Sequence, residues 1–130
     1  GDIRFPLIDT EVQLKLFEDL KSLKQLFDFV ILDTGAGLNS EVVTSILNTD
    51  ETVVITTPEP TAVMDAYAVI KTVCLEAGEH LNLKLIVNAA WSPLDAEETG
   101  RKLQMVVNHF LKVQIHYTLA PLPRPDILCT

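Results

Sequence analysis

The stretch Phe29–Asn39, FVILDTGAGLN, sets the fold class and raises the main functional question. Its first four residues are apolar, an acid follows at Asp33, and Gly35 and Gly37 come next. A continuous apolar run is typical of a strand that is covered on both faces, as in parallel sheets. Asp33 then has several interpretations: the corner of an aspartic protease, the magnesium-side carboxylate of a nucleotide-binding domain, or a plain strand-to-helix turn.

Helical patterns recur along the chain. Apolar residues at helical spacing predict helices over 10–26, 38–47, 61–77 and 92–111. Thr10 and Gln13 match a capping box, in which a hydroxyl and an amide bind free backbone donors of the first turn. Thr61 is expected to cap the third helix and Gly78 to end it. Asp95 is expected to return a hydrogen bond to the start of the fourth helix.

Apolar or β-branched runs separate these helices. They predict strands over 29–32, 52–56, 83–87 and 113–118. Strands that alternate with helices in this way form a mainly parallel sheet with helices on both faces. Since no repeat, low-complexity segment or internal linker is visible, we expect a single α/β domain over residues 1–130.

Composition and charge exclude several function classes. The chain is 48% hydrophobic and 22% charged, as folded proteins are, and its net charge of −8 gives no reason to expect nucleic-acid binding. No leader-like segment and no run of about eighteen apolar residues occurs, so no membrane segment is expected. The two cysteines fit a reducing, cytoplasmic compartment, and the three histidines show no metal-ligand spacing with them.

The protease interpretation of Asp33 fails on the rest of the chain. A carboxylate dyad needs two Asp-Thr-Gly corners, from two lobes or from a homodimer. A protease with one corner per chain is all-β, and a later glycine after two bulky apolar residues braces the corner. Gly78 and Gly100 follow Glu-Ala and Glu-Thr instead, and helical patterns fill the intervening sequence. The nucleotide and turn interpretations remain.

Polar residues stand at three of the four predicted strand ends. These strand exits are 33–35, 57–60, 88–90 and 118–120. In open parallel sheets, ligands bind beyond the carboxyl ends of the strands. The exits are therefore where we expect a binding site.

Together, the exits resemble a known family. FDFVILDTGAGLNSEV, VVITTPEPTAVMDAYAVIK and LIVNAA closely resemble consecutive segments of the MinD/ParA-type P-loop ATPases, above all the flagellar-number regulator branch called FlhG, YlxH or FleN. The likeness extends from about Leu26 through Asn88, weakens over 92–110 and resumes faintly at HYTLAPLP. It implies a Rossmann-like P-loop fold. It also implies a parent protein that binds ATP and magnesium, forms a homodimer, and positions flagella, the division site or chromosomes with protein partners.

The resemblance also implies roles for single residues. Asp33 matches the acid that holds the magnesium shell through water and helps to place the attacking water. Gly35 and Gly37 match the switch segment that approaches the γ-phosphate. Asn88 matches the asparagine whose amide reads the adenine edge, and Pro121 lies in a loop expected along the base.

Some of these roles have alternatives. Asn88 could simply cap the turn that follows its strand. Residues 58–61 match a TTPEPT-like turn that shapes the loop and the dimer-facing side, and Asp65 matches an acidic helix position. Asp65 could equally serve the first helical turn electrostatically. Trp91 replaces a basic residue that often follows the family's asparagine region, which leaves the base-binding details open.

The glycine-rich phosphate loop of the family, of the KGGxGKT type, does not occur in residues 1–130. The chain is therefore expected to be the C-terminal part of such an ATPase. By itself, this part is expected to bind no nucleotide and to hydrolyse no ATP. In the family, the strand before that loop lies between 29–32 and 52–56. Without it, we expect these two strands to pair directly, or the chain to dimerise or exchange elements. The alternative is a non-catalytic α/β interaction module that kept the scaffold and lost nucleotide binding.

Overall fold

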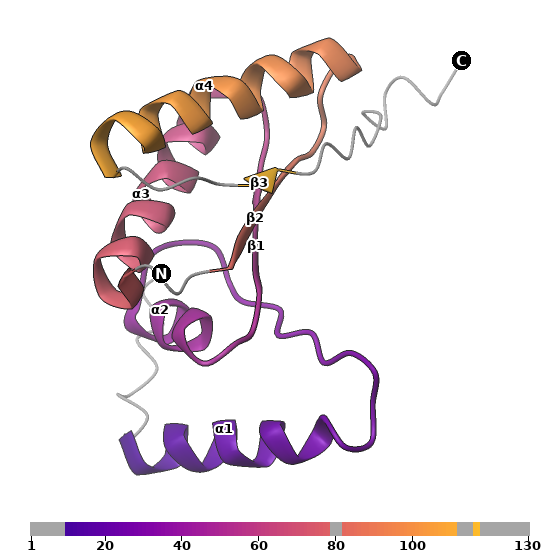
Figure 1. Cartoon of the computed structure of the whole chain (residues 1–130), viewed down its shortest axis with the longest axis vertical. Helices are drawn as coiled ribbons and strands as arrows, with labels where there is room; N and C mark the ends of the chain where they lie inside the picture. Colours follow the sequence, from indigo (N-terminus) through magenta and orange to yellow (C-terminus); the bar gives the residue numbers. More distant parts are fainter. Residues whose placement is uncertain (1–9, 79–81, 112–115, 118–130) are drawn as a thin grey trace, which may run out of the picture. The chain divides into compact units, whose positions relative to one another are not determined.

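The computed structural model describes residues 10–78, 82–111 and 116–117 (Figure 1). Contacts divide the chain into two compact units, Gly1–Thr34 and Gly35–Thr130. A single domain over 1–130 would require these two units to pack on each other. The prediction of one domain therefore stays a prediction.

The first unit contains helix α1, which spans Thr10–Leu23. It is shorter than the predicted 10–26 because the chain then tightens into a turn, in which Leu26 N–H donates to the Leu23 carbonyl at 2.9 Å. Phe17 is the buried apolar side chain of α1. The side chain of Thr10 lies outside the described residues, so the capping box at this end stays a prediction.

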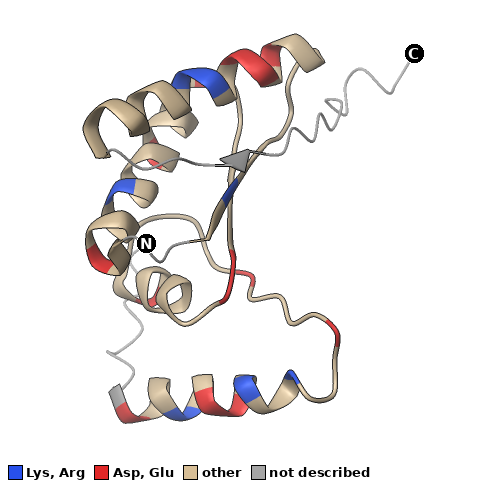
Figure 2. Ribbon diagram, in the orientation of Figure 1, with Lys and Arg blue, Asp and Glu red and all other residues tan. Residues whose placement is uncertain are grey.

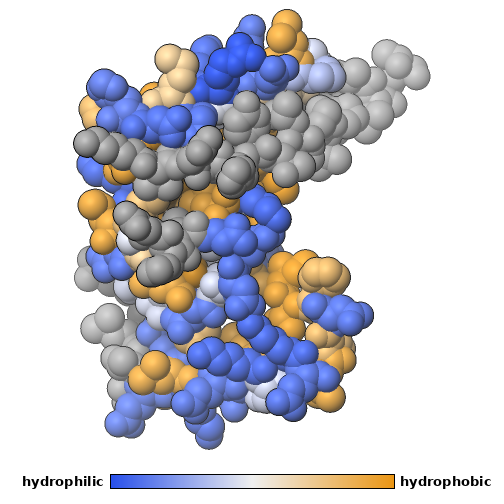
Figure 3. All heavy atoms as spheres, in the orientation of Figure 1, coloured by the Kyte–Doolittle hydropathy of each residue, from blue (hydrophilic) through white to orange (hydrophobic). Residues whose placement is uncertain are grey.

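The apolar run 29–32 forms no strand, so the prediction of a strand there was wrong. Phe29 and Ile31 are each 87% exposed. Figure 3 shows hydrophobic atoms on the surface of the segment that follows α1. A strand needs a neighbour that pairs with its backbone groups and apolar surface that packs on its side chains. Within the first unit, no described strand pairs with this run.

The second unit contains a parallel sheet. Strand β1 (Thr52–Thr56) pairs with β2 (Leu83–Val87), and β2 pairs with β3 (His116–Tyr117). The order is β1-β2-β3, which confirms the α/β class with parallel strands. Of the predicted last strand over 113–118, only 116–117 are described. The predicted direct pairing of 29–32 with β1 concerns two separate units, and it stays a prediction, as do its alternatives of dimerisation or element exchange.

Two helices of this unit pack on the sheet, and a third packs on one of them. They are α2 (Ser40–Leu47), α3 (Pro60–Ala77) and α4 (Pro93–Leu111). Helix α3 contacts β1, α4 contacts β2, and α2 packs on α3. Figure 1 shows α2 and α3 to the left of the strands and α4 crossing the view above them. On β1, Val54 and Thr56 are buried while Val53 and Ile55 are exposed, so the predicted cover on both faces is not found within the described part of this unit.

The core of the second unit lies between the sheet and its helices. Leu85, Val87, Ile70 and Leu103 come from both strand and helices, and at most 1% of each is exposed. Fully burying an apolar side chain of this size contributes about 1.5–3 kcal/mol. A smaller cluster of Val42, Ile46 and Val73 joins α2 to α3.

The ends of α3 differ in part from expectation. The residue before the helix is Glu59, whose side chain makes no capping hydrogen bond, and Pro60 is the first helical residue. The predicted cap at Thr61 was therefore wrong, because Pro fits the first helical position with its preset φ and needs no N–H there. Gly78 ends the helix as predicted, with a φ of +66° and its N–H donating to the Cys74 carbonyl.

The start of α4 follows the predicted pattern with a small shift. Asp95 N–H donates to Ser92 Oγ at 3.1 Å. The Asp95 carboxylate accepts from the N–H of Trp91 at 3.0 Å, one residue before Ser92. These bonds satisfy backbone donors that the first turn would leave free.

Candidate functional site

The carboxyl ends of β1 and β2 lie side by side. The two strands are parallel, and Thr56 pairs with Val87. The N–H of Asn88 donates to the Thr56 carbonyl at 2.7 Å, which extends the ladder one residue past β2. The turn 57–60 and the loop 88–92 therefore meet at the edge of the sheet where open parallel sheets bind ligands.

Asn88 is half-buried at this edge. Its carboxamide oxygen accepts a hydrogen bond from Ala89 N–H at 2.8 Å, so the side chain does support the turn that follows the strand. The structure gives the carboxamide nitrogen no hydrogen bond to any described residue. Asn88 can thus support the turn and still offer a donor to a ligand.

The turn after β1 offers little chemistry of its own. Thr56 is buried, and its hydroxyl donates to the Thr57 carbonyl at 3.2 Å. Pro58 is half-buried and Glu59 is exposed. Asp65 is exposed beyond the first turn of α3, which contains no acidic residue, so the first-turn interpretation of Asp65 does not hold.

Asp33 belongs to the first unit and Asn88 to the second, and each unit is described by itself. Asp33 is exposed in a segment without regular secondary structure. An added Cβ at Gly35 or Gly37 would meet no atom within 4 Å, but Gly37 has a φ of +106°. Backbone conformation therefore requires glycine at position 37, whereas neither conformation nor space requires it at position 35.

Other predicted groups contribute no geometry to this edge. Pro121 and its loop lie outside the described residues. Among residues 10–78, 82–111 and 116–117, no group of three or more His, Cys, Asp or Glu side chains could hold a metal ion. Burial raises the pKa of the Cys74 thiol, which packs against the main core from α3.

Charged side chains of both signs occur along α1 and α4 (Figure 2). On α4, Arg101 pairs with Glu97 at 2.8 Å, and Lys84 of β2 pairs with Glu51 at 2.7 Å. Exposed pairs of this kind contribute at most about 1 kcal/mol each. Within the described helices, none is long and apolar enough to cross a membrane.

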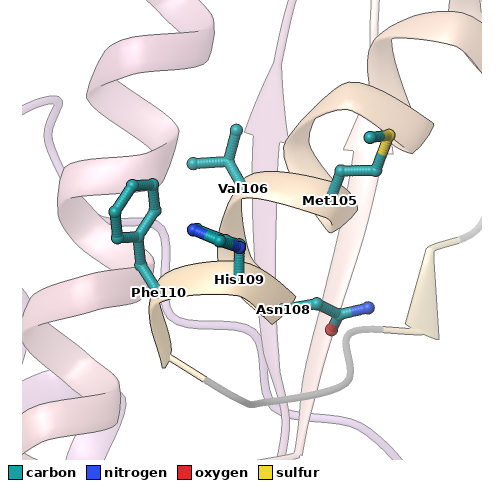
Figure 4. Close-up of a pocket in the computed structure, with 5 residues that line it drawn as sticks. All are labelled: Met105, Val106, Asn108, His109 and Phe110. Atoms are coloured by element: carbon teal, nitrogen blue, oxygen red, sulfur yellow. The ribbon is translucent and has the colours of Figure 1, made fainter.

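A hollow of about 530 Å³ lies on the last turns of α4 (Figure 4). It is lined by Met105, Val106, Asn108, His109 and Phe110. The rings of His109 and Phe110 meet edge to face, with centroids 4.8 Å apart. Ligand sites bring polar groups together from several elements, whereas this lining comes from one helix and includes no predicted site residue.

Comparison with known proteins finds relatives that match part of the chain. No family model matches the chain. It is 32% identical over 105 residues to the flagellum site-determining protein YlxH of Helicobacter pylori. This match covers 80% of the chain and 35% of YlxH. Over 102 residues it is 29% identical to the antiactivator FleN of Pseudomonas aeruginosa, covering 78% and 36%. The chain is related to MinD/ParA-type proteins over part of their length.

The septum site-determining protein MinD of Bacillus subtilis is a further relative, 33% identical over 91 residues, or 69% of this chain and 33% of that MinD. The chain thus spans about a third of the length of each of these curated relatives. The resemblance inferred from the sequence, including the flagellar branch of the MinD/ParA family, is confirmed.

Sequence reasoning missed two residues that shape these loops. Asn39 caps α2, with its Oδ1 accepting from Val42 N–H at 2.9 Å. Asparagine is a preferred N-cap residue, so that signal was present in the sequence. Ala89 adopts a φ of +53°, and alanine gives no sequence signal for that conformation.

Proposed function

We propose that the chain is a portion of a MinD/ParA-like ATP-binding protein that positions cell machinery such as flagella. The observation that carries this proposal is the similarity to YlxH and FleN over 80% and 78% of the chain. The name of the first relative, flagellum site-determining protein, refers to the flagellum, and flagellar positioning is therefore preferred over the division site or chromosomes.

In the intact protein, the chain supplies the base end of the nucleotide site. Asn88 binds the adenine edge, and the loop that contains Pro121 lies along the base. Support comes from the position of Asn88 at the carboxyl edge of β2 and from its carboxamide nitrogen, which is hydrogen-bonded to no described residue.

The magnesium end is assigned by resemblance. Asp33 holds the magnesium shell through water, and Gly35 and Gly37 form the segment beside the γ-phosphate. An exposed carboxylate and a glycine with positive φ fit these roles. The lysines and backbone amides that hold phosphates in this family have no counterpart in residues 1–130, so the chain alone neither holds ATP nor hydrolyses it.

The test begins with the complete reading frame that contains this chain. A strand followed by a KGGxGKT-like loop before residue 1 supports the proposal. An unrelated domain before residue 1 supports the rival function, a non-catalytic α/β interaction module. The observation that favours this rival is that residues 1–130 contain no KGGxGKT-like loop.

Binding of ATP with magnesium to the full-length gene product then tests the site. Asn88→Ala removes a hydrogen bond to the base, and a loss of about 1.4 kcal/mol corresponds to tenfold weaker binding. Asn108→Ala is the matched control, because Asn108 is an exposed asparagine on α4. Equal affinities of the Asn88→Ala and Asn108→Ala variants would remove Asn88 from the site.

We also propose that the isolated chain forms a homodimer by strand addition. The run 29–32 is apolar and largely exposed, and β1 is the outer strand of the described sheet, with Val53 and Ile55 exposed. Unpaired strand edges bind extended apolar segments. Sedimentation should show an association that increases with concentration and is lost in an Ile31→Lys variant. A monomer at all concentrations would contradict this proposal.

A further inference from the structure

Ala89 has a strained backbone at the predicted base site. Among the described residues, Ala89 is the one non-glycine residue with a positive φ, and its φ is +53°. Residues with a Cβ enter this region at a cost, and they stay there only when the surroundings hold them. Such an outlier beside a candidate ligand residue suggests a functional constraint.

Both neighbours of Ala89 are fixed. On one side, Asn88 N–H donates to the Thr56 carbonyl at 2.7 Å. On the other side, Ala90 is 2% exposed and belongs to the main core cluster. The chain must therefore turn within one residue, from the end of the ladder into the core.

The turn has a consequence for the Asn88 side chain. Ala89 N–H donates to the carboxamide oxygen of Asn88 at 2.8 Å, which fixes the plane of the amide. The carboxamide nitrogen is left as the donor with no described partner. We infer that Ala89 is a positioning residue that holds the Asn88 carboxamide with its nitrogen directed to ligand, so that the ligand group bound there is a hydrogen-bond acceptor, such as an unprotonated purine ring nitrogen. This inference rests on the proposed function.

Substitutions at Asn88 separate the two halves of its amide. Asn88→Asp keeps an oxygen that can accept from Ala89 N–H but replaces the donor with an acceptor. In the full-length gene product, ATP with magnesium should bind at least about tenfold more weakly to this variant. Asn108→Asp makes the same change in charge on α4, and its affinity should match that of the wild type.

Substitutions at Ala89 test the positioning role. Glycine adopts a positive φ readily, whereas a β-branched residue there is a true outlier. Ala89→Gly should bind ATP within about twofold of the wild type, and Ala89→Val about tenfold more weakly. Wild-type affinity in Asn88→Asp or in Ala89→Val would overturn the inference.

Hydrogen exchange without nucleotide separates this inference from the proposed function. The amide of residue 89 should exchange slowly in the wild type, Ala89→Gly and Asn88→Asp, and faster in Asn88→Ala and Ala89→Val. If the wild type binds no ATP with magnesium, the proposed function fails. Equal exchange at residue 89 in the wild type and Asn88→Ala would overturn the positioning role whatever the nucleotide result.

Discussion

Two segments of this chain have similar sequence patterns and different structures. In FVILDTGAG an apolar run ends in an acid and glycines, and in LKLIVNAA it ends in an asparagine and alanines. The second run is β2, with a parallel neighbour on each side and Leu85 and Val87 buried. The first run has no regular secondary structure, and Phe29 and Ile31 are each 87% exposed. An apolar run therefore permits a strand, but backbone pairing and side-chain packing create it.

The largest expected difference between the two segments is in core stability. Leu85→Ala should lower the free energy of unfolding by about 2–5 kcal/mol, because it leaves a cavity in the main core. Phe29→Ala should change it by less than about 0.5 kcal/mol, because Phe29 is 87% exposed. Urea denaturation of dilute protein measures both values. A comparable loss in Phe29→Ala would mean that the run 29–32 is packed in solution.

A smaller difference is expected within the glycine segment. Gly37→Ala should cost about 1–3 kcal/mol, because its φ of +106° is disfavoured for residues with a Cβ. Gly35→Ala should cost nothing measurable, since its φ is not positive and open space surrounds it. Thermal denaturation of the pair tests this. If both substitutions have the same effect, the segment does not hold its described conformation.

The smallest effect concerns Cys74 on α3. Burial raises the pKa of this thiol above its ordinary value of 9.0, so the unfolded chain releases the proton first as the pH rises. Stability should be unaffected by Cys74 below pH 9.0 and should fall as the pH passes from 9.0 through the raised pKa. Cys74→Ala should remove this part of the pH dependence. An unchanged pH profile in that variant would show that the partial burial of Cys74 does not raise the pKa of its thiol.

Local signals predicted most of the helix ends in the second unit. Gly78 ends α3, and Ser92 and Asp95 begin α4, because these ends depend on nearby residues. The runs β1 and β2 match their predicted bounds because each has a parallel partner in the described sheet. The strand at 29–32 could not be predicted from its own residues, since it depends on a neighbour elsewhere in the sequence. The conformation of Ala89 was equally hidden, because Thr56 and the core impose it.

The residues of the candidate site also differ in how far the sequence alone could place them. The position of Asn88 followed from the parallel strands, so the sequence was enough to place it at the carboxyl edge. Asp33 was assigned by resemblance alone. The base end of the site is thus supported by geometry, and the magnesium end by family likeness.

Amide hydrogen exchange tests the central claim most directly, namely that 29–32 becomes a strand only when a neighbouring strand pairs with it, as we propose for the intact protein. In the dilute 130-residue chain, Val30, Ile31 and Leu32 should exchange at nearly unprotected rates while Leu85, Ile86 and Val87 exchange slowly. In the full-length gene product, both segments should be protected, and ATP with magnesium should slow exchange further over 33–37. Protection of 29–32 equal to that of β2 in the dilute chain would contradict the account.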